Sequence, residues 1–266
     1  MSNVTLIIPS YRNPKYLDLC LKSAVENRVD PKNGITVILD GYVEENREVI
    51  ALYEDAVDFI ELEENQGMQT ALNYGVMQAT TPYVFIINDD NVMPKEWDTR
   101  LMKDVLVMGD KFALTVDQIE PTGPGMFKFP VHDLGQDVDS FDYKAWLEYE
   151  YSTKQMMVAG DGRIFPFVMK KKYYLACGGF DTFYDSPNIC DWDFFLKLEL
   201  LGFSFPRTRS LRLYHFGSVA TKKNAESTQF TERERHAYEM YNWKWGALPY
   251  NGNQNTKIHP SGFRGF

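Results

Sequence analysis

Four short, mostly apolar runs, separated by helix-like segments, constrain the fold of this chain more than any other feature. The runs are too short for core helices and are rich in Val, Ile and Leu; they cover residues 4–9, 35–39, 58–62 and 83–87. Such runs are typical of buried strands. Four alternations of strand and helix within about ninety residues predict a parallel sheet with right-handed crossovers. The expected fold class is therefore α/β.

Polar residues follow the end of every one of these runs. Ser10 and Tyr11 follow the first run, Asp40 the second, Asn65 the third, and the stretch 88–91 the fourth. The carboxyl ends of parallel strands meet at one edge of a sheet, where open α/β folds bind their ligands. Asn and Asp are also ordinary turn formers, but their concentration at this end of each strand favours a ligand site.

The adjacent Asp89 and Asp90 indicate a divalent cation. Neighbouring carboxylates raise each other's pKa unless a cation lies between them. Mg²⁺ and Mn²⁺ commonly take one or two carboxylates and complete their coordination with substrate phosphates and water. A solvated turn is the alternative explanation of this pair.

Composition and missing motifs disfavour several classes of protein. No GxGxxG follows the first run and no GxxxxGK[ST] occurs, which disfavours a dinucleotide-dependent dehydrogenase and a P-loop enzyme. The net charge of −9 disfavours broad binding to a nucleic-acid backbone. Cys20, Cys177 and Cys190 lack the spacing of a zinc site or a disulfide framework, and no apolar run approaches the ~20 residues of a membrane span. We therefore expect a soluble, cytoplasmic protein.

Several segments, in this order along the chain, resemble motifs of family 2 glycosyltransferases, which have the GT-A fold. They are Pro9-Ser-Tyr-Arg-Asn-Pro14, Asp40 after the second run, Asn65-x-Gly67-x-x-x-Ala71-x-Asn73-x-Gly75, Asn88-Asp-Asp90 before Pro94 and Trp97, Gly178-Gly-Phe-Asp181, Cys190-Asp-Trp-Asp193, and His215-x-Gly217-Ser218. The resemblance implies a Rossmann-like α/β/α sandwich with a mainly parallel central sheet and a C-terminal helical tail. It also implies a metal-dependent, inverting transfer of a sugar from a UDP-sugar, or another NDP-sugar, to an acceptor hydroxyl.

The resemblance divides the chain into three parts. Residues 1–98 would form the nucleotide-sugar-binding half, residues 99–218 the acceptor-binding and catalytic half of the same GT-A domain, and residues 219–266 a C-terminal helix and tail. Residues 101–151 lack a regular pattern, yet their many aromatic side chains indicate an ordered acceptor-side lobe.

The resemblance also implies residues that bind the nucleotide and the metal. Tyr11 would stack on the base, Asp40 would accept a hydrogen bond from a uracil N–H, and Asp89 would contact the ribose. The nucleotide-binding set is Pro9, Tyr11, Asp40, Asn65, Asn88 and Asp89, and the ligands of the Mn²⁺ or Mg²⁺ ion are Asp90 and His215. The family often has Asp where this chain has Asn88, and the missing charge should weaken metal binding. A lone histidine such as His215 is otherwise more often structural.

Asp191 matches the family's catalytic base, which would take the proton of the acceptor hydroxyl. The Glu that precedes this base in the family is Cys190 here, so less like-charge repulsion should act on the pKa of Asp191. Other candidate contacts to the diphosphate or the acceptor are Arg163, Gly179, Asp181, Asp193, Lys222 and Lys223. Gly179 would allow a positive φ. Asp193 would equally well cap a helix, and the basic residues would equally well be solvated.

Two further regions carry predicted elements. Strands are expected at 156–160 and 164–168. Near the C-terminus, Thr231-x-x-Glu234 predicts the start of a helix that places Tyr238, Tyr241 and Trp245 on one face.

The sequence leaves the sugar, the acceptor and the oligomeric state open. The acceptor would be a glycan, a protein or a modified nucleic-acid base. Two other functions stay open as well: a nucleotidyltransferase on a similar fold, and a catalytically silent module that binds nucleotides or sugars. Cys190 and Asn88, the departures from the family pattern, are the features that favour the silent module.

Overall fold

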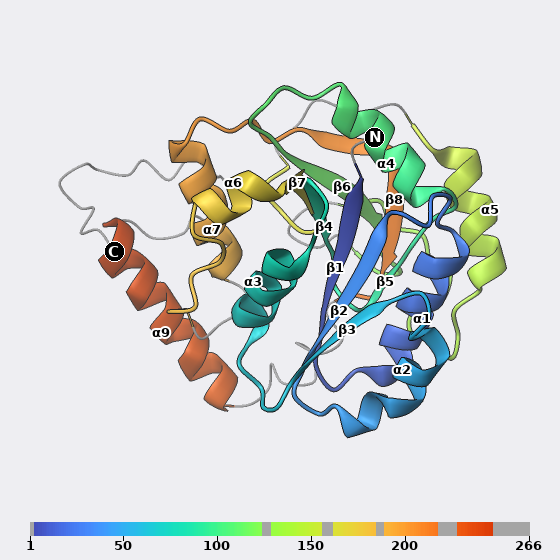
Figure 1. The fold of residues 1–266 in the computed structure, drawn as a ribbon, viewed down its shortest axis with the longest axis horizontal. Coiled ribbons are helices and arrows are strands. Elements are labelled where there is room, and N and C mark those ends of the chain that lie inside the picture. Colours follow the sequence, from blue (N-terminus) through green and yellow to red (C-terminus); the bar gives the residue numbers. More distant parts are fainter. Residues whose placement is uncertain (1–2, 124–128, 156–161, 185–188, 218–227, 247–266) are drawn as a thin grey trace.

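The centre of the molecule is one mixed sheet covered by helices on both faces (Figure 1). The computed structural model describes residues 3–123, 129–155, 162–184, 189–217 and 228–246, the side chains of 228–231 excepted. Within these residues the sheet has eight strands in the order β3-β2-β1-β4-β7-β6-β8-β5.

The first half of the chain forms the parallel part of this sheet. Its elements are β1 (Val4–Ser10), α1 (Pro14–Glu26), β2 (Gly34–Asp40), η1 (Glu44–Asn46), α2 (Arg47–Tyr53), β3 (Asp58–Leu62), α3 (Met68–Gln78) and β4 (Tyr83–Ile86). Strand β1 pairs in parallel with β2 and β4, and β2 pairs in parallel with β3. The parallel strands predicted from the apolar runs are confirmed.

The second half completes the sheet in mixed orientation. Its elements are β5 (Asn91–Val92), α4 (Trp97–Leu106), β6 (Ala113–Ile119), α5 (Tyr143–Thr153), β7 (Phe167–Lys170), α6 (Lys171–Ala176), α7 (Cys190–Leu200), β8 (Arg207–His215) and α9 (Thr228–Trp245). Strand β7 lies antiparallel between β4 and β6, β6 is parallel to β8, and β5 is antiparallel to β8. The α/β class with a mainly parallel sheet is confirmed.

Several expectations for the second half need correction. The stretch 101–151, which lacks a regular pattern in sequence, contains β6 and α5, and the predicted boundary after residue 98 falls inside α4. The strand expected at 164–168 runs instead from Phe167 to Lys170, while the one expected at 156–160 lies outside the described residues.

Two apolar layers, one on each face of the sheet, hold the helices. One layer joins α1, α2 and α4 to the sheet and includes Leu17 and Trp97. The other joins α3, α6, α7 and α9 and includes Phe167 and Phe194. The glycine at position 75 lets helix α3 lie close to the sheet, because a Cβ atom there would come within 2.4 Å of Ile38 Cδ1.

Helix α9 packs with a different face from the one expected. It begins at Thr228, before the predicted start at Thr231. Tyr241 and Trp245 are buried as predicted, but Tyr238 is 37% exposed and Ala237 takes the inward position. The buried stripe therefore follows the i, i+4, i+8 spacing of a helix that lies along the apolar layer.

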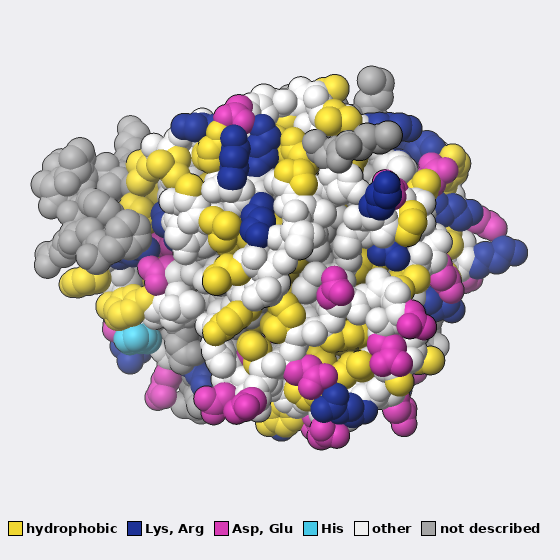
Figure 2. Space-filling view, in the orientation of Figure 1, with side chains coloured by type: hydrophobic (Ala, Val, Ile, Leu, Met, Phe, Trp, Pro, Cys, Tyr) yellow, Lys and Arg dark blue, Asp and Glu magenta, His cyan; other side chains and the backbone are white. Residues whose placement is uncertain are grey.

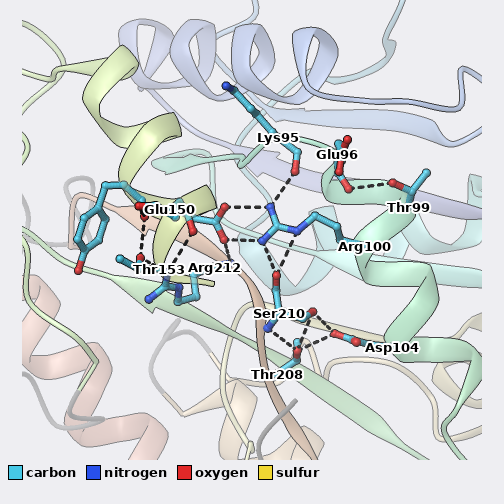
Figure 3. A network of polar contacts seen from close by, with 12 residues as sticks. Lys95, Glu96, Thr99, Arg100, Asp104, Glu150, Thr153, Thr208, Ser210 and Arg212 are labelled. Atoms are coloured by element: carbon cyan, nitrogen blue, oxygen red, sulfur yellow. Dashed lines mark hydrogen bonds and ion pairs between the residues drawn. The ribbon is translucent and has the colours of Figure 1, made fainter. Parts of the chain in front are cut away.

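A buried ionic network joins α4, α5 and β8 (Figure 3). Glu150 is fully buried and accepts hydrogen bonds from Arg100 Nη1 at 2.9 Å and Nη2 at 2.7 Å. It also accepts one from the backbone N–H of Arg212 at 3.1 Å. This carboxylate is tolerated inside the protein because its donors replace water. The network holds β8, the strand that ends at His215.

Replacing Glu150 tests the network. Glu150→Gln leaves the Arg100 guanidinium buried without its counter-charge, so we expect a loss of about 3–5 kcal/mol in the free energy of unfolding. Urea unfolding followed by circular dichroism measures it. Glu148→Gln, an exposed position on the same helix, serves as the control and should leave the midpoint unchanged. Equal midpoints for the two variants would show that the network contributes no stability.

Candidate functional site

The carboxylate of Asp89 ties the end of β4 to the loop after β1. Its Oδ2 accepts a hydrogen bond from Ser10 Oγ at 2.7 Å, and its Oδ1 accepts one from Asn13 Nδ2 at 3.2 Å. Burial, followed by the neighbouring charge of Asp90, raises the pKa of Asp89 to about 7. The predicted convergence of the ends of β1 and β4 is therefore present.

Asp90 faces His215 across the sheet. His215 Nε2 lies 3.5 Å from Asp90 Oδ1. The antiparallel pairing of β5 with β8 sets Asn91 opposite His215, and the backbone N–H of Phe216 donates to the Asp90 carbonyl at 3.3 Å. These contacts bring together two residues that lie far apart in sequence, as the metal-ligand prediction requires.

Glu120, which sequence reasoning missed, lies behind this pair. Its Oε1 is 2.9 Å from His215 Nδ1, the ring nitrogen that faces away from Asp90. Glu120 comes directly after β6, so the sequence signal for it was the end of a strand that had not been recognised. A carboxylate on the second nitrogen of a histidine orients the ring.

The chemistry of this pair fits a divalent cation that shares its coordination with a substrate. Asp90 offers an oxygen donor and His215 a nitrogen donor, and the two converge. Over the described part of the chain, no group of three or more His, Cys, Asp or Glu residues is arranged to enclose a metal by itself. Mg²⁺ and Mn²⁺ sites that use substrate phosphates need only one or two protein carboxylates.

Asp40 holds the loop before α3 together. Only 3% of this residue is exposed, and its carboxylate accepts hydrogen bonds from Gln66 N at 2.6 Å, Gly67 N at 2.9 Å and Asn65 Nδ2 at 3.0 Å. Burial raises the pKa of Asp40, and the two backbone N–H donors partly offset this. In the structure, the carboxylate of Asp40 holds this loop. Its predicted contact with a uracil ring stays a prediction.

An aromatic pair lies at the carboxyl ends of β1 and β2. Tyr11 meets Tyr42 edge to face with ring centroids 5.3 Å apart, and the Arg12 guanidinium lies 3.7 Å from the Tyr42 ring centroid. Arg12 and Tyr42 both have positive φ, 54° and 52°. Such backbone is uncommon for residues other than glycine and gathers at functional sites. Pro9 lies within β1, beside this pair. The sequence singled out Tyr11 and missed its two partners.

Asp191 lies in the first turn of α7 and is partly exposed. Its Oδ1 accepts a hydrogen bond from Trp192 N at 2.8 Å. Burial of the carboxyl group is the main reason that its pKa is raised to about 7, and the charge of Glu234 on α9 contributes to this rise. The pKa of Asp191 is therefore raised even though the residue before it is Cys190 and not an acid.

The loop from Gly178 to Asp181 is held against α3. Gly178 and Gly179 have φ values of 82° and 66°, as predicted for this pair. Asn73 on α3 donates to the Phe180 carbonyl at 2.8 Å and accepts from the Phe180 N–H at 2.9 Å. A Cβ atom at Gly179 would lie 2.4 Å from Asn73 Oδ1.

The chain that follows this loop reaches the start of α3. Gln69 Nε2, in the first turn of α3, donates to the Tyr184 carbonyl at 2.8 Å. Because α3 starts just after β3, this contact brings Tyr184 to the carboxyl edge of the parallel strands, the edge that carries Asp40 and Asp89.

Other candidate contacts have partners within the protein or lie outside the described residues. Asp193 is fully buried and bonds to α9, which removes it from the reach of a substrate, and it does not cap α7, whose N-cap residue is Ile189. Asp181 accepts a hydrogen bond from Lys244 at 2.7 Å. Arg163 pairs with Glu199 at 2.8 Å, toward the end of α7 away from Asp191. Lys222 and Lys223 lie outside the described residues.

Comparison with known proteins identifies the family. The model of glycosyl transferase family 2 matches residues 5–152, more than half of the chain. The chain belongs to glycosyl transferase family 2. The matched region contains Tyr11, Asp40 and Asp89–Asp90, which the sequence analysis assigned to the donor side.

Two curated relatives match shorter stretches. A teichoic acid poly(glycerol phosphate) polymerase of Staphylococcus epidermidis is 30% identical over 95 residues, 34% of this chain and 13% of that protein. A poly-beta-1,6-N-acetyl-D-glucosamine synthase of Staphylococcus aureus is 26% identical over 98 residues, 36% of this chain and 24% of that protein. The chain thus matches less than a quarter of the length of either relative.

Solved structures of S. aureus TarS share the fold. TarS 1–349 in complex with UDP-GlcNAc aligns with a TM-score of 0.58 and 14% identity, over 94% of this chain and 74% of that one. TarS 1–349 in complex with UDP aligns with a TM-score of 0.57 and 12% identity over the same shares. At this identity the likeness establishes the GT-A-type architecture. Within the described residues, no helix has the length and apolar character that a membrane crossing demands.

A pair of glycine variants tests the contact between α3 and the Gly178–Asp181 loop. Both Gly178→Ala and Gly179→Ala place a side chain at positive φ, but only the second meets a neighbour, because no atom lies within 4 Å of a Cβ at Gly178. We expect Gly179→Ala to be less stable than Gly178→Ala by about 1–3 kcal/mol, measured by urea unfolding. Equal losses would mean that Asn73 does not press on this backbone.

Proposed function

We propose that this protein is a glycosyltransferase that moves a sugar from a UDP-sugar to an acceptor hydroxyl, with a divalent cation and with inversion at the anomeric carbon. The observation that carries the proposal is the approach of Asp90 to His215 at the carboxyl edge of the sheet, in a chain of glycosyl transferase family 2. Asp191, with its raised pKa, would supply the base.

A UDP-sugar is the donor that the comparisons favour. The TarS structures in complex with UDP and with UDP-GlcNAc have the same fold. In this chain Tyr11, Arg12 and Tyr42 offer aromatic and cationic surface beside Asp40, the surroundings that a flat, polar base requires.

Asp90 and His215 would hold the cation, with Glu120 orienting the imidazole ring. A bound Mg²⁺ or Mn²⁺ stabilises the negative charge that develops on a leaving diphosphate. Asn88 in place of an acid lowers the negative charge near this ion, so we expect its affinity for the free protein to be modest.

Asp191 would act as the general base. Its carboxylate accepts the proton of the acceptor hydroxyl while the acceptor oxygen forms a bond to the anomeric carbon. The bond from that carbon to the diphosphate oxygen breaks, and its electron pair leaves with UDP. A single displacement of this kind inverts the anomeric centre and needs no covalent intermediate. A base with a pKa near 7 suits proton transfer at neutral pH.

The acceptor is a glycan, a protein or a modified nucleic-acid base. Figure 2 shows that, on the face viewed, acidic side chains gather toward the bottom near α2 and β3, whereas basic ones are common near α6. This face offers no continuous basic surface of the kind that a nucleic-acid backbone needs, which favours a glycan or a protein.

Removing the base is the direct test of the mechanism. Asp191→Asn keeps the shape of the side chain but cannot take a proton, so we expect kcat to fall by ~10²–10⁴-fold. Release of UDP from a panel of UDP-sugars measures turnover, and calorimetry with UDP checks that the nucleotide still binds. In the wild-type enzyme kcat should rise with pH through about 7 and then level off, because only the deprotonated carboxylate works and its pKa is raised. Full activity of the variant would exclude this role.

Nucleotide binding tests the donor and the metal. We expect calorimetry to detect UDP binding with Mn²⁺ and little with EDTA, and to show weaker binding of GDP and dTDP. Asp90→Ala should abolish the effect of Mn²⁺. An unchanged response in this variant would remove Asp90 from the metal site.

Binding without release of UDP from any donor would favour the catalytically silent module, and release of pyrophosphate would favour a nucleotidyltransferase.

A further inference from the structure

We propose that Lys244 and Trp245, at the end of α9, are positioning residues for Asp191, so that the C-terminal helix forms part of the active site. This inference rests on the proposed function and adds to it, because neither residue touches the reacting groups. The residues that carry it are Asp181, Asp193, Lys197, Lys244 and Trp245, here called the Asp193 cluster.

Asp193 is the centre of this cluster. It is fully buried. Its Oδ1 accepts hydrogen bonds from Trp245 Nε1 at 2.8 Å and from Tyr184 Oη at 3.1 Å, and Lys244 Nζ lies 2.7 Å away. Its Oδ2 lies 3.3 Å from Lys197 Nζ. One carboxylate on α7 therefore binds two consecutive residues of α9.

The cluster also reaches the glycine loop. Lys244 bonds to Asp181 at 2.7 Å, and Lys197 donates to the Gly179 carbonyl at 2.6 Å. Burial alone would raise the pKa of Asp181, but Lys244, the backbone N–H of Phe183 and the charge of Lys197 together outweigh it, so the pKa is lowered. The loop, α7 and α9 are thus connected by the same charges.

Packing alone does not require these groups. Elsewhere α9 is held to the protein by Ala237 and Tyr241 in the apolar layer. Lys244 and Lys197 are only 3% and 6% exposed, and enclosing such ammonium groups with two carboxylates costs desolvation and side-chain entropy. Directional bonds of this kind fix one arrangement of the helices, which apolar contacts do less strictly.

The bonds of the Asp193 cluster fix the start of α7, the turn that carries Asp191. Asp191 lies in the same first turn of α7 as Asp193, whose backbone N–H bonds to the Ile189 carbonyl at 3.2 Å. Glu234, nearer the start of α9, is placed so that its charge acts on Asp191. On α7 itself, Cys190 and Asp193 are the titratable neighbours of Asp191. A shift of α9 would therefore displace Glu234, and it would also displace the turn of α7 that carries Asp191.

Two tryptophan variants on the same helix test the inference. Trp245→Phe keeps an aromatic ring but removes the Nε1–H donor to Asp193. We expect kcat for UDP release to fall by about tenfold, since a misplacement of 1 Å can cost up to ~10²-fold, with KM for the UDP-sugar nearly unchanged. The acid limb of the pH profile should move to lower pH, because Glu234 and the enclosure of Asp191 both loosen. Trp243→Phe, at a position 49% exposed, should match the wild type.

Two further measurements keep the test decisive. Lys244→Arg keeps the positive charge and should retain more activity than Lys244→Met. Hydrogen exchange in a peptide over residues 189–196 should be faster in Trp245→Phe than in Trp243→Phe, with no difference in a peptide over 68–78.

The outcomes separate this inference from the proposed function. If Trp245→Phe only lowers the urea midpoint, while kcat per folded protein and the acid limb equal those of Trp243→Phe, the cluster is structural and the inference is wrong. If the wild type releases no UDP, or Asp191→Asn still does, the proposed function fails. Hydrogen exchange then still reports whether Trp245 holds the start of α7.

Discussion

A carboxylate enters the interior of a protein only where donors from the protein replace its water, and this constraint organises the whole molecule. Asp98 accepts bonds from Val29 N, Asp30 N and Asn33 Nδ2, at 2.8–3.0 Å, and so connects α4 to the turn before β2. Glu150 connects α4, α5 and β8, and Asp193 connects α7 to α9. Each buried acid joins segments that are distant in sequence.

The candidate site contains acids of a different kind. Asp98 and Glu150 each accept several hydrogen bonds and hold neighbouring segments in place. Asp89 and Asp191 each have a pKa raised to about 7, with burial as the main cause. The protein thus contains both buried carboxylates that hold the scaffold and carboxylates whose burial raises their pKa.

The parallel strands and their ligand edge were predictable from sequence because their signals are local. Short apolar runs indicate strands that are buried on both faces. Gly75, Gly178 and Gly179 indicate positions where the backbone approaches a neighbour closely or has a positive φ. Strand β6 was not predictable in this way. Its residues are all buried, yet the strand includes Asp117, which becomes tolerable only because Arg207 and Arg209 of β8 reach it. Since β6 was missed, so was Glu120 at its end.

The same limit applies to Asp193 and Cys190. In sequence, Asp193 is one more acid beside the base, and only the position of Lys244 and Trp245 shows that it faces inward. Cys190 is fully buried in the apolar layer, where burial raises its thiol pKa and keeps it neutral. The negative charge that helps to raise the pKa of Asp191 comes instead from Glu234, on the helix that the Asp193 cluster holds. Burial is the main cause of the raised pKa of Asp191, and the C-terminal helix, far along the chain from the motif that contains Asp191, adds to it through Glu234.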